Sequence, residues 1–86
     1  MTNPEIQEHL YQWACGKGFD APYGVLTGSE TNRNGRRHLT VTFGRARTLD
    51  ATVQVYGEHF LRLRTSTHGA EVYRDLPSLM ARLETL

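Results

Sequence analysis

Residues 33–47 read RNGRRHLTVTFGRAR and carry the clearest structural signal in the chain. The Asn-Gly pair at 34–35 is the strongest short signal for a β-hairpin, because a type I′ turn needs positive φ at both central positions. After it, Leu39, Val41 and Phe43 alternate with polar residues, which is typical of a half-buried antiparallel strand. The stretch therefore predicts a hairpin turn followed by a strand with one face in the core.

The same alternation continues on both sides of this stretch. Val25 and Leu26 open a short segment before it. The apolar members of the alternating segments after it are Leu49, Ala51, Val53, Val55, Leu61, Leu63 and Val72. We predict an antiparallel sheet of four strands, or of five if all of these segments pair.

The length of the loop that begins at Gly57 fixes which face of the next strand is buried. A two-residue loop would bury Arg62 and Arg64, whereas a three-residue loop would pair Val55 with Leu61. A register change of one residue moves every side chain of the strand to the other face of the sheet. A buried arginine without a partner costs several kcal/mol. We therefore predict the three-residue loop.

A helix is predicted before the strands. Asn3 is a good N-cap residue, and Pro4 suits the first helical turn. The apolar stripe of this helix comprises Ile6, Leu10, Trp13 and Ala14. Gly16 or Gly18 should end it, because glycine accepts the left-handed backbone of a C-cap. Cys15 flanks the stripe, where we expect a small buried residue.

A second helix is predicted after the strands, with Asp75 or Ser78 as its cap and Pro77 in or next to its first turn. Its apolar stripe comprises Leu76, Leu79, Met80, Leu83 and Leu86. Each helix and the sheet have one apolar face, so both helices should pack on the same face of the sheet. The predicted fold is α+β, a single domain over residues 1–86 in the order helix, four strands with room for a fifth, helix.

Composition narrows the classes of function that the chain can have. The chain has 86 residues and ten Lys and Arg against nine Asp and Glu, a net charge of +1. Dedicated DNA-binding domains usually carry a larger basic excess, because phosphate neutralisation supplies most of their affinity. No apolar run reaches the roughly 20 residues of a membrane span, and the N-terminus has no signal-peptide pattern. One cysteine allows no internal disulfide, so we expect a cytoplasmic protein.

Residue patterns of catalysis and cofactor binding are missing. Cys15 has no histidine at pair spacing, and the four histidines have no i, i+4 pair that would suggest a metal site. Gly16-Lys17-Gly18 lacks the remaining positions of a phosphate loop. We expect no enzyme activity, no cofactor and no metal.

The uncovered face of the sheet, here called the open face, is the candidate functional surface. Alternation assigns to it His38, Thr40, Thr42, Thr52, Gln54, Tyr56, Phe60, Arg62, Arg64, Glu71 and Tyr73. Aromatic residues and arginine are enriched in the hot spots of interfaces. The predicted partner-binding residues are Tyr56, Phe60, Arg62, Arg64 and Tyr73, with Arg36, Arg37 and Arg45 at the strand ends.

Two resemblances bear on these residues. The order of helix, strands and helix is similar to that of double-stranded RNA-binding domains, but the last helix, DLPSLMAR at 75–82, lacks their Lys-rich motif. In size and layout the chain resembles small inhibitor proteins of phages and plasmids, such as anti-CRISPR proteins. That resemblance implies a protein that binds and blocks a macromolecular partner.

Three hypotheses follow. The first is a non-catalytic interaction domain, an inhibitor or adaptor that binds a protein or nucleoprotein partner through the open face. The second is a nucleic-acid-binding domain that uses the open face and the basic band Arg33–Arg47, whose affinity would fall steeply with salt. The third is a homodimer that pairs edge strands or open faces.

Overall fold

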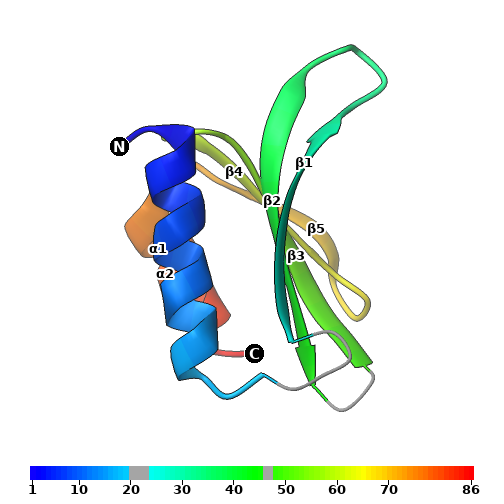
Figure 1. Ribbon diagram of the computed structural model, residues 1–86. Coiled ribbons are helices and arrows are strands. Elements are labelled where there is room, and N and C mark those ends of the chain that lie inside the picture. Colours follow the sequence, from blue (N-terminus) through cyan, green and yellow to red (C-terminus); the bar gives the residue numbers. More distant parts are fainter. Residues whose placement is uncertain (20–23, 46–47) are drawn as a thin grey trace.

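The computed structural model of the chain describes residues 1–19, 24–45 and 48–86. Its elements are α1 (Asn3–Gly16), β1 (Val25–Thr31), β2 (Arg37–Arg45), β3 (Thr48–Gly57), β4 (Phe60–Thr65), β5 (Gly69–Tyr73) and α2 (Leu76–Leu83). Figure 1 shows both helices on one side of a twisted sheet. The predicted α+β layout is confirmed, and the described strands form a five-stranded sheet.

Each strand pairs with the next strand along the chain. The order across the sheet is β1-β2-β3-β4-β5, and all four neighbouring pairs are antiparallel. Such a meander needs no crossover connection, because tight turns suffice to join antiparallel strands. β1 and β5 are therefore the edges of the sheet.

The hairpin between β1 and β2 is confirmed, but its turn differs from the prediction. The carbonyl of Asn32 accepts a hydrogen bond from the amide of Gly35 at 3.0 Å, and the amide of Asn32 donates to the carbonyl of Arg36 at 3.0 Å. Gly35 has φ of 78°, which favours glycine. This is a three-residue loop that ends in a left-handed glycine, so Asn32, rather than Arg33, lies opposite Arg36.

The connection between β3 and β4 has the predicted pairing but reaches it by another route. Val55 pairs with Leu61, as predicted, and Gly57 pairs with Phe60, with a register shift between Val55 and Gly57. Tyr56 is thus an extra residue in β3, which is the geometry of a β-bulge. A two-residue turn and one bulged residue together keep the arginines of β4 out of the core.

The core lies between the sheet and the two helices. Its fully buried members are Ile6, Leu10, Ala14, Val41, Phe43, Ala51, Val53, Val55, Leu61, Leu63, Leu79 and Leu83. The ring of Phe43 lies 5.8 Å from that of Trp13 and 4.8 Å from that of Phe19. Leu49, which was predicted for the core, has a side chain outside the described ones, and Leu86 lies beyond α2 and is exposed.

Hydrogen bonds at the N-terminal ends of the helices cap both helices and tie α1 to the sheet. Thr2, rather than the predicted Asn3, caps α1: its hydroxyl accepts from the amide of Glu5, and the Glu5 carboxylate accepts from the amide of Thr2. Asn3 instead donates from its side chain to the carbonyl of Tyr56 at 3.1 Å, which ties the start of α1 to the bulge. Asp75 caps α2, as one of the two predicted alternatives.

A polar contact joins the end of α1 to the residue that follows α2. The indole nitrogen of Trp13 and the ammonium of Lys17, both from the end of α1, donate to the carboxylate of Glu84 at 2.8 Å. Glu84 follows α2 directly. The two helices therefore meet at their C-terminal ends.

Candidate functional site

The register shows which side chains share the open face. Beside the predicted residues of β2, β3 and β4, this face carries Leu26, Gly28 and Glu30 of β1 and Ala70 and Val72 of β5. Three of its polar residues are nevertheless buried: His38, Thr40 and Gln54 are only 3%, 7% and 5% exposed. The ring of Tyr56 covers His38, so this part of the open face is packed rather than solvated.

One end of the open face is an aromatic–arginine cluster of Arg36, His38, Tyr56, Phe60 and Arg74. The ring of Tyr56 stacks on that of His38 at 4.4 Å and lies 4.9 Å from that of Phe60. The guanidinium of Arg36 lies 5.0 Å from the ring of Tyr56 and 5.3 Å from that of Phe60. Arg74 lies 5.5 Å from the ring of Phe60. These separations are within the range of cation–π attraction.

The bulge at Tyr56 builds this cluster. An extra residue bends its strand and increases the local twist. It sets the ring of Tyr56 against both His38 on the neighbouring strand and Phe60 just past the turn. The hairpin loop of β1 and β2 supplies Arg36 from the other side.

The remaining predicted residues fall in four places. Arg62 and Arg64 lie on the open face in β4, and no hydrogen bond or ion pair joins either guanidinium to another described residue. Arg37 alternates with His38 and borders the start of α1 instead. The side chain of Arg45 lies outside the described ones. Tyr73 lies on the helix-covered face, contrary to the prediction.

The face of β5 is therefore the reverse of the predicted one. Tyr73 pairs with the buried Leu61 and Glu71 with the buried Leu63, which places both residues under α2. Val72, predicted for the core, is 49% exposed on the open face. Arg74 follows β5 and reaches Phe60, and the orientation predicted for β5 gave it no place on the open face.

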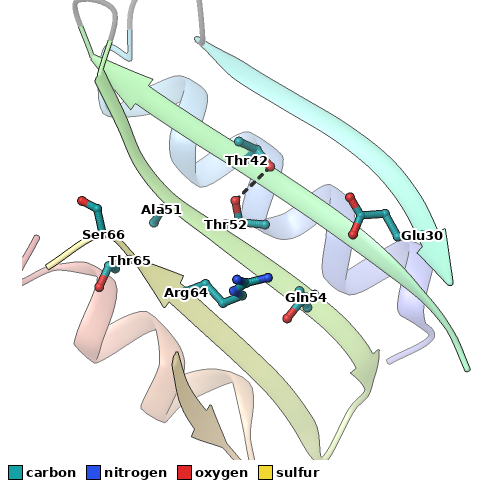
Figure 2. Close-up of a pocket in the computed structure, with 8 residues that line it drawn as sticks. All are labelled: Glu30, Thr42, Ala51, Thr52, Gln54, Arg64, Thr65 and Ser66. Atoms are coloured by element: carbon teal, nitrogen blue, oxygen red, sulfur yellow. Dashed lines mark hydrogen bonds between the residues drawn. The ribbon is translucent and has the colours of Figure 1, made fainter. Parts of the chain in front are cut away.

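The middle of the open face is hollow. The hollow has a volume of about 410 Å³. It is lined by Glu30, Thr42, Ala51, Thr52, Gln54, Arg64, Thr65 and Ser66. Figure 2 shows Glu30 at one side, Ser66 and Thr65 at the other, and Arg64 and Gln54 between them. The hydroxyl oxygens of Thr42 and Thr52 lie 3.3 Å apart and share a hydrogen bond.

A buried polar pair borders the hollow. The terminal amide of Gln54 lies 3.2 Å from Nε2 of His38, and a carboxylate oxygen of Glu30 lies 3.6 Å from the same nitrogen. At 3.6 Å the carboxylate is too far from the ring for a hydrogen bond. The amide nitrogen of Gln54 faces Nε2 of His38 and can donate to it when that ring nitrogen carries no hydrogen.

This arrangement leaves two buried polar atoms unpaired. Neither the amide oxygen of Gln54 nor Nδ1 of His38 has a hydrogen-bond partner among the described residues. A buried polar group without a partner costs about 1–3 kcal/mol.

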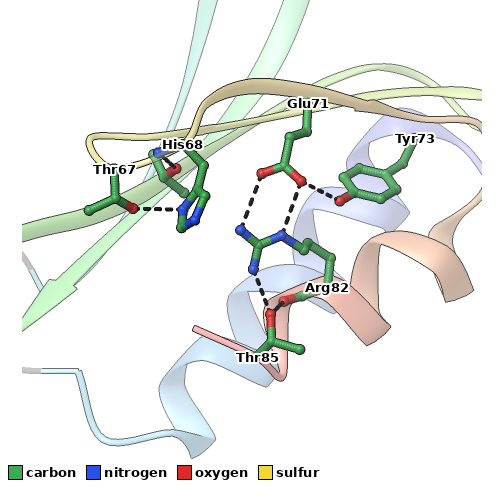
Figure 3. Close-up of polar contacts among 7 residues, drawn as sticks. Thr67, His68, Glu71, Tyr73, Arg82 and Thr85 are labelled. Atoms are coloured by element: carbon green, nitrogen blue, oxygen red, sulfur yellow. Dashed lines mark hydrogen bonds and ion pairs between the residues drawn. The ribbon is translucent and has the colours of Figure 1, made fainter.

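The covered side of β5 holds a separate polar network (Figure 3). Arg82 of α2 donates to the carboxylate of Glu71 at 3.0 and 3.3 Å, and the hydroxyl of Tyr73 donates to it at 2.7 Å. The hydrogen bond from Arg82, with that from Tyr73, lowers the pKa of Glu71 below its ordinary value. Burial, followed by the Glu71 carboxylate, raises the pKa of Tyr73. The network fastens α2 to the sheet.

Cys15 does not occupy the predicted position. Its side chain is exposed, because the buried stripe of α1 runs through Ile6, Leu10 and Ala14 and turns the next residue outward.

Within residues 1–19, 24–45 and 48–86, no group of three or more His, Cys, Asp or Glu side chains could hold a metal ion. No helix in these ranges is long and apolar enough to cross a membrane.

Comparison with known proteins found no family model, no curated protein and no solved structure that matches the chain.

Proposed function

We propose that this chain is a non-catalytic interaction domain, an inhibitor or adaptor that binds a protein or nucleoprotein partner through the aromatic–arginine cluster. The observation that carries the proposal is the contact of Arg36 with the rings of both Tyr56 and Phe60. Tyrosine and arginine are, with tryptophan, the residue types enriched in the hot spots of interfaces.

The cluster is suited to binding because it is already ordered. Rings and guanidinium groups that are packed on one another lose little side-chain entropy when a partner arrives. Arginine side chains otherwise carry up to about 2 kcal/mol of rotamer entropy each. A partner that contacts this cluster therefore retains more of the interaction free energy.

Charge indicates the kind of surface that fits. The described side chains of the open face and its cluster include the four arginines Arg36, Arg62, Arg64 and Arg74, against the single acid Glu30. Complementary potentials steer association and suppress wrong partners. The proposed partner therefore presents acidic groups around an apolar or aromatic centre.

A protein surface fits these observations better than unpaired bases. Bases bind by stacking on exposed ring faces, whereas here guanidinium groups cover the rings of Tyr56 and Phe60. The basic band Arg33–Arg47 also divides, because Arg36 joins the cluster and Arg37 points to the opposite side of β2.

The test compares a double variant of the cluster with a charge reversal at the neighbouring Arg37. Affinity purification from the native host, with mass spectrometry and nucleic-acid detection on the eluate, would identify the partner. Arg36→Glu combined with Phe60→Ala should reduce partner recovery by about tenfold or more, since hot-spot truncations cost at least about 2 kcal/mol. Arg37→Glu, the matched control, should change recovery less than about twofold, as expected for a residue outside the interface.

Circular dichroism would show that both variants fold. Unchanged recovery with the folded double variant, or an equal loss with Arg37→Glu, would refute the proposed surface. A partner that nuclease treatment removes from the eluate, with steep salt dependence, would instead support the nucleic-acid hypothesis.

A further inference from the structure

The outer edge of β1 has the features of a strand that pairs with another chain. β1 has seven residues, and all but the first are exposed. It pairs with β2 without a register shift, and its sequence, VLTGSET, contains no Lys and no Pro. A flat, exposed edge without lysine, proline or a bulge is a template for pairing with a further strand. The aromatic–arginine cluster contributes no residue to this edge, so this inference is independent of the proposed function.

The hydrogen bonds at the two ends of β1 show which of its backbone groups face outward. The carbonyl of Gly24 accepts from the amide of Gly44 at 3.1 Å, and the amide of Asn32 donates to the carbonyl of Arg36 at 3.0 Å. Hydrogen-bonded and non-hydrogen-bonded pairs alternate along an antiparallel ladder, so the even-numbered residues of β1 bond to β2. The amides and carbonyls of the odd-numbered residues therefore point away from the sheet. Within the described part of the chain, no hydrogen bond engages these groups.

Two side chains of the open face select the register in which two copies of this edge can pair. Leu26, which is 54% exposed, and Glu30 lie on either side of the centre of β1. In an antiparallel pair with its two-fold axis through Thr27, the two Leu26 residues lie about 7 Å apart along the strands and the two Glu30 residues about 20 Å apart. An axis through Ser29 reverses these separations, and an axis through Gly28 makes both about 14 Å. Apolar contact and charge repulsion therefore both favour the axis through Thr27.

We propose that a second copy of the chain pairs with this edge, antiparallel and with the two-fold axis through Thr27, so that two five-stranded sheets join into one. Thr27 then pairs with Thr27 of the second copy, and Val25 with Ser29 of the second copy. Each of these pairs exchanges two backbone hydrogen bonds. Leu26 lies opposite Gly28 of the second copy, and the missing side chain of the glycine leaves room for the leucine.

The position of α1 leaves room for this arrangement. α1 contacts β1, β2 and β3, so it lies above β2. In the joined sheet the two β2 strands are three strand spacings apart, about 14 Å, whereas packed helices need only about 8–10 Å between their axes. The two copies of α1 therefore fit on the same face of the sheet. A single strand pair is a small interface, below the roughly 1,200 Å² of standard interfaces, so the dimer should be reversible and depend on protein concentration.

Sedimentation equilibrium over graded protein concentrations would measure the dimer Kd. Leu26→Glu should raise this Kd about 5- to 30-fold, because it removes two cross-strand pairs and brings two like charges together. Val72→Glu is the matched control, since Val72 is 49% exposed on the same face but lies in the other edge strand. It should change Kd less than about twofold, as expected for a screened charge outside the interface. A chain that stays monomeric at every concentration, or equal effects of the two variants, would overturn the proposal.

Oxidative cross-linking tests the register. Cys15, the only cysteine, is exposed and would first be replaced by serine. Thr27→Cys should then form a disulfide-linked dimer, because the Cα atoms of a hydrogen-bonded pair are about 5.5 Å apart, within the range of a disulfide. Ser29→Cys is the control, since its two copies would lie about 14 Å apart along the strands. Linkage through Ser29→Cys instead of Thr27→Cys would overturn the proposed axis.

Arg36→Glu combined with Phe60→Ala should leave the dimer Kd unchanged within about twofold, as expected for residues outside the interface. Failure of the proposed function and failure of the dimer are therefore distinguishable.

Discussion

Phe43→Ala should lower the free energy of unfolding by about 3–5 kcal/mol, the range expected for truncating a buried phenylalanine. Phe43 is fully buried and is the largest fully buried side chain in the described core. Its ring contacts Trp13 of α1 and Phe19, so alanine would leave a cavity where helix and sheet meet. Chemical denaturation followed by Trp13 fluorescence would measure the change.

The size of the effect matters because the chain is short. A domain of 86 residues is expected to have a free energy of unfolding of about 4–13 kcal/mol. Phe43→Ala would therefore remove a large share of the total. Leu26→Ala is the control: this side chain is 54% exposed, and its loss should cost at most about 0.5 kcal/mol. Equal effects of the two substitutions would contradict the core described here.

Tyr73→Ala should lower the free energy of unfolding by about 2–4 kcal/mol, whereas Val72→Ala should change it by about 0.5 kcal/mol or less. Tyr73 packs against the buried core and donates to Glu71. Val72 lies on the open face and is half exposed. Denaturant titrations of both variants under the same conditions would measure the difference.

This pair of substitutions tests the orientation of β5 directly. Tyr73→Phe separates the contributions, because it keeps the packed ring and removes only the hydroxyl that donates to Glu71. It should cost about 0.5–1.5 kcal/mol, the net value of one hydrogen bond. A larger loss from Val72→Ala than from Tyr73→Ala would show that β5 presents the opposite face to the core.

The pairing of β3 with β4 could be predicted from the sequence because an energy difference decides it. Only the register that pairs Val55 with Leu61 keeps Arg62 and Arg64 out of the core, and this register is confirmed. The way the chain achieves it could not be predicted. A bulge at Tyr56 with a two-residue turn and a three-residue loop give the same alternation downstream.

The orientation of β5 could not be predicted because its local pattern is misleading. Val72 stands between Glu71 and Tyr73, and alternation alone places the aliphatic residue inside. The decisive partner is Arg82, which lies on α2 and neutralises Glu71 under the helix. A contact between residues eleven positions apart on different elements leaves no periodic signal in the sequence.

The candidate site was partly visible in the sequence. Tyr56 and Phe60 share the predicted face, and Arg36 joins them. The burial of His38 and Gln54 was not predicted, because strand alternation assigns a face but says nothing of what covers it.

The meander order of the strands has a consequence for how the chain folds. Since every strand pairs with its neighbour in sequence, each step of sheet assembly closes only a short loop, and the entropy of loop closure stays small. Low relative contact order goes with fast folding. Among the hydrogen bonds of the described residues, the longest loop is closed when Trp13 and Lys17 reach Glu84. Docking of the terminal helices is therefore the step with the greatest entropic cost, and the sheet can form before it.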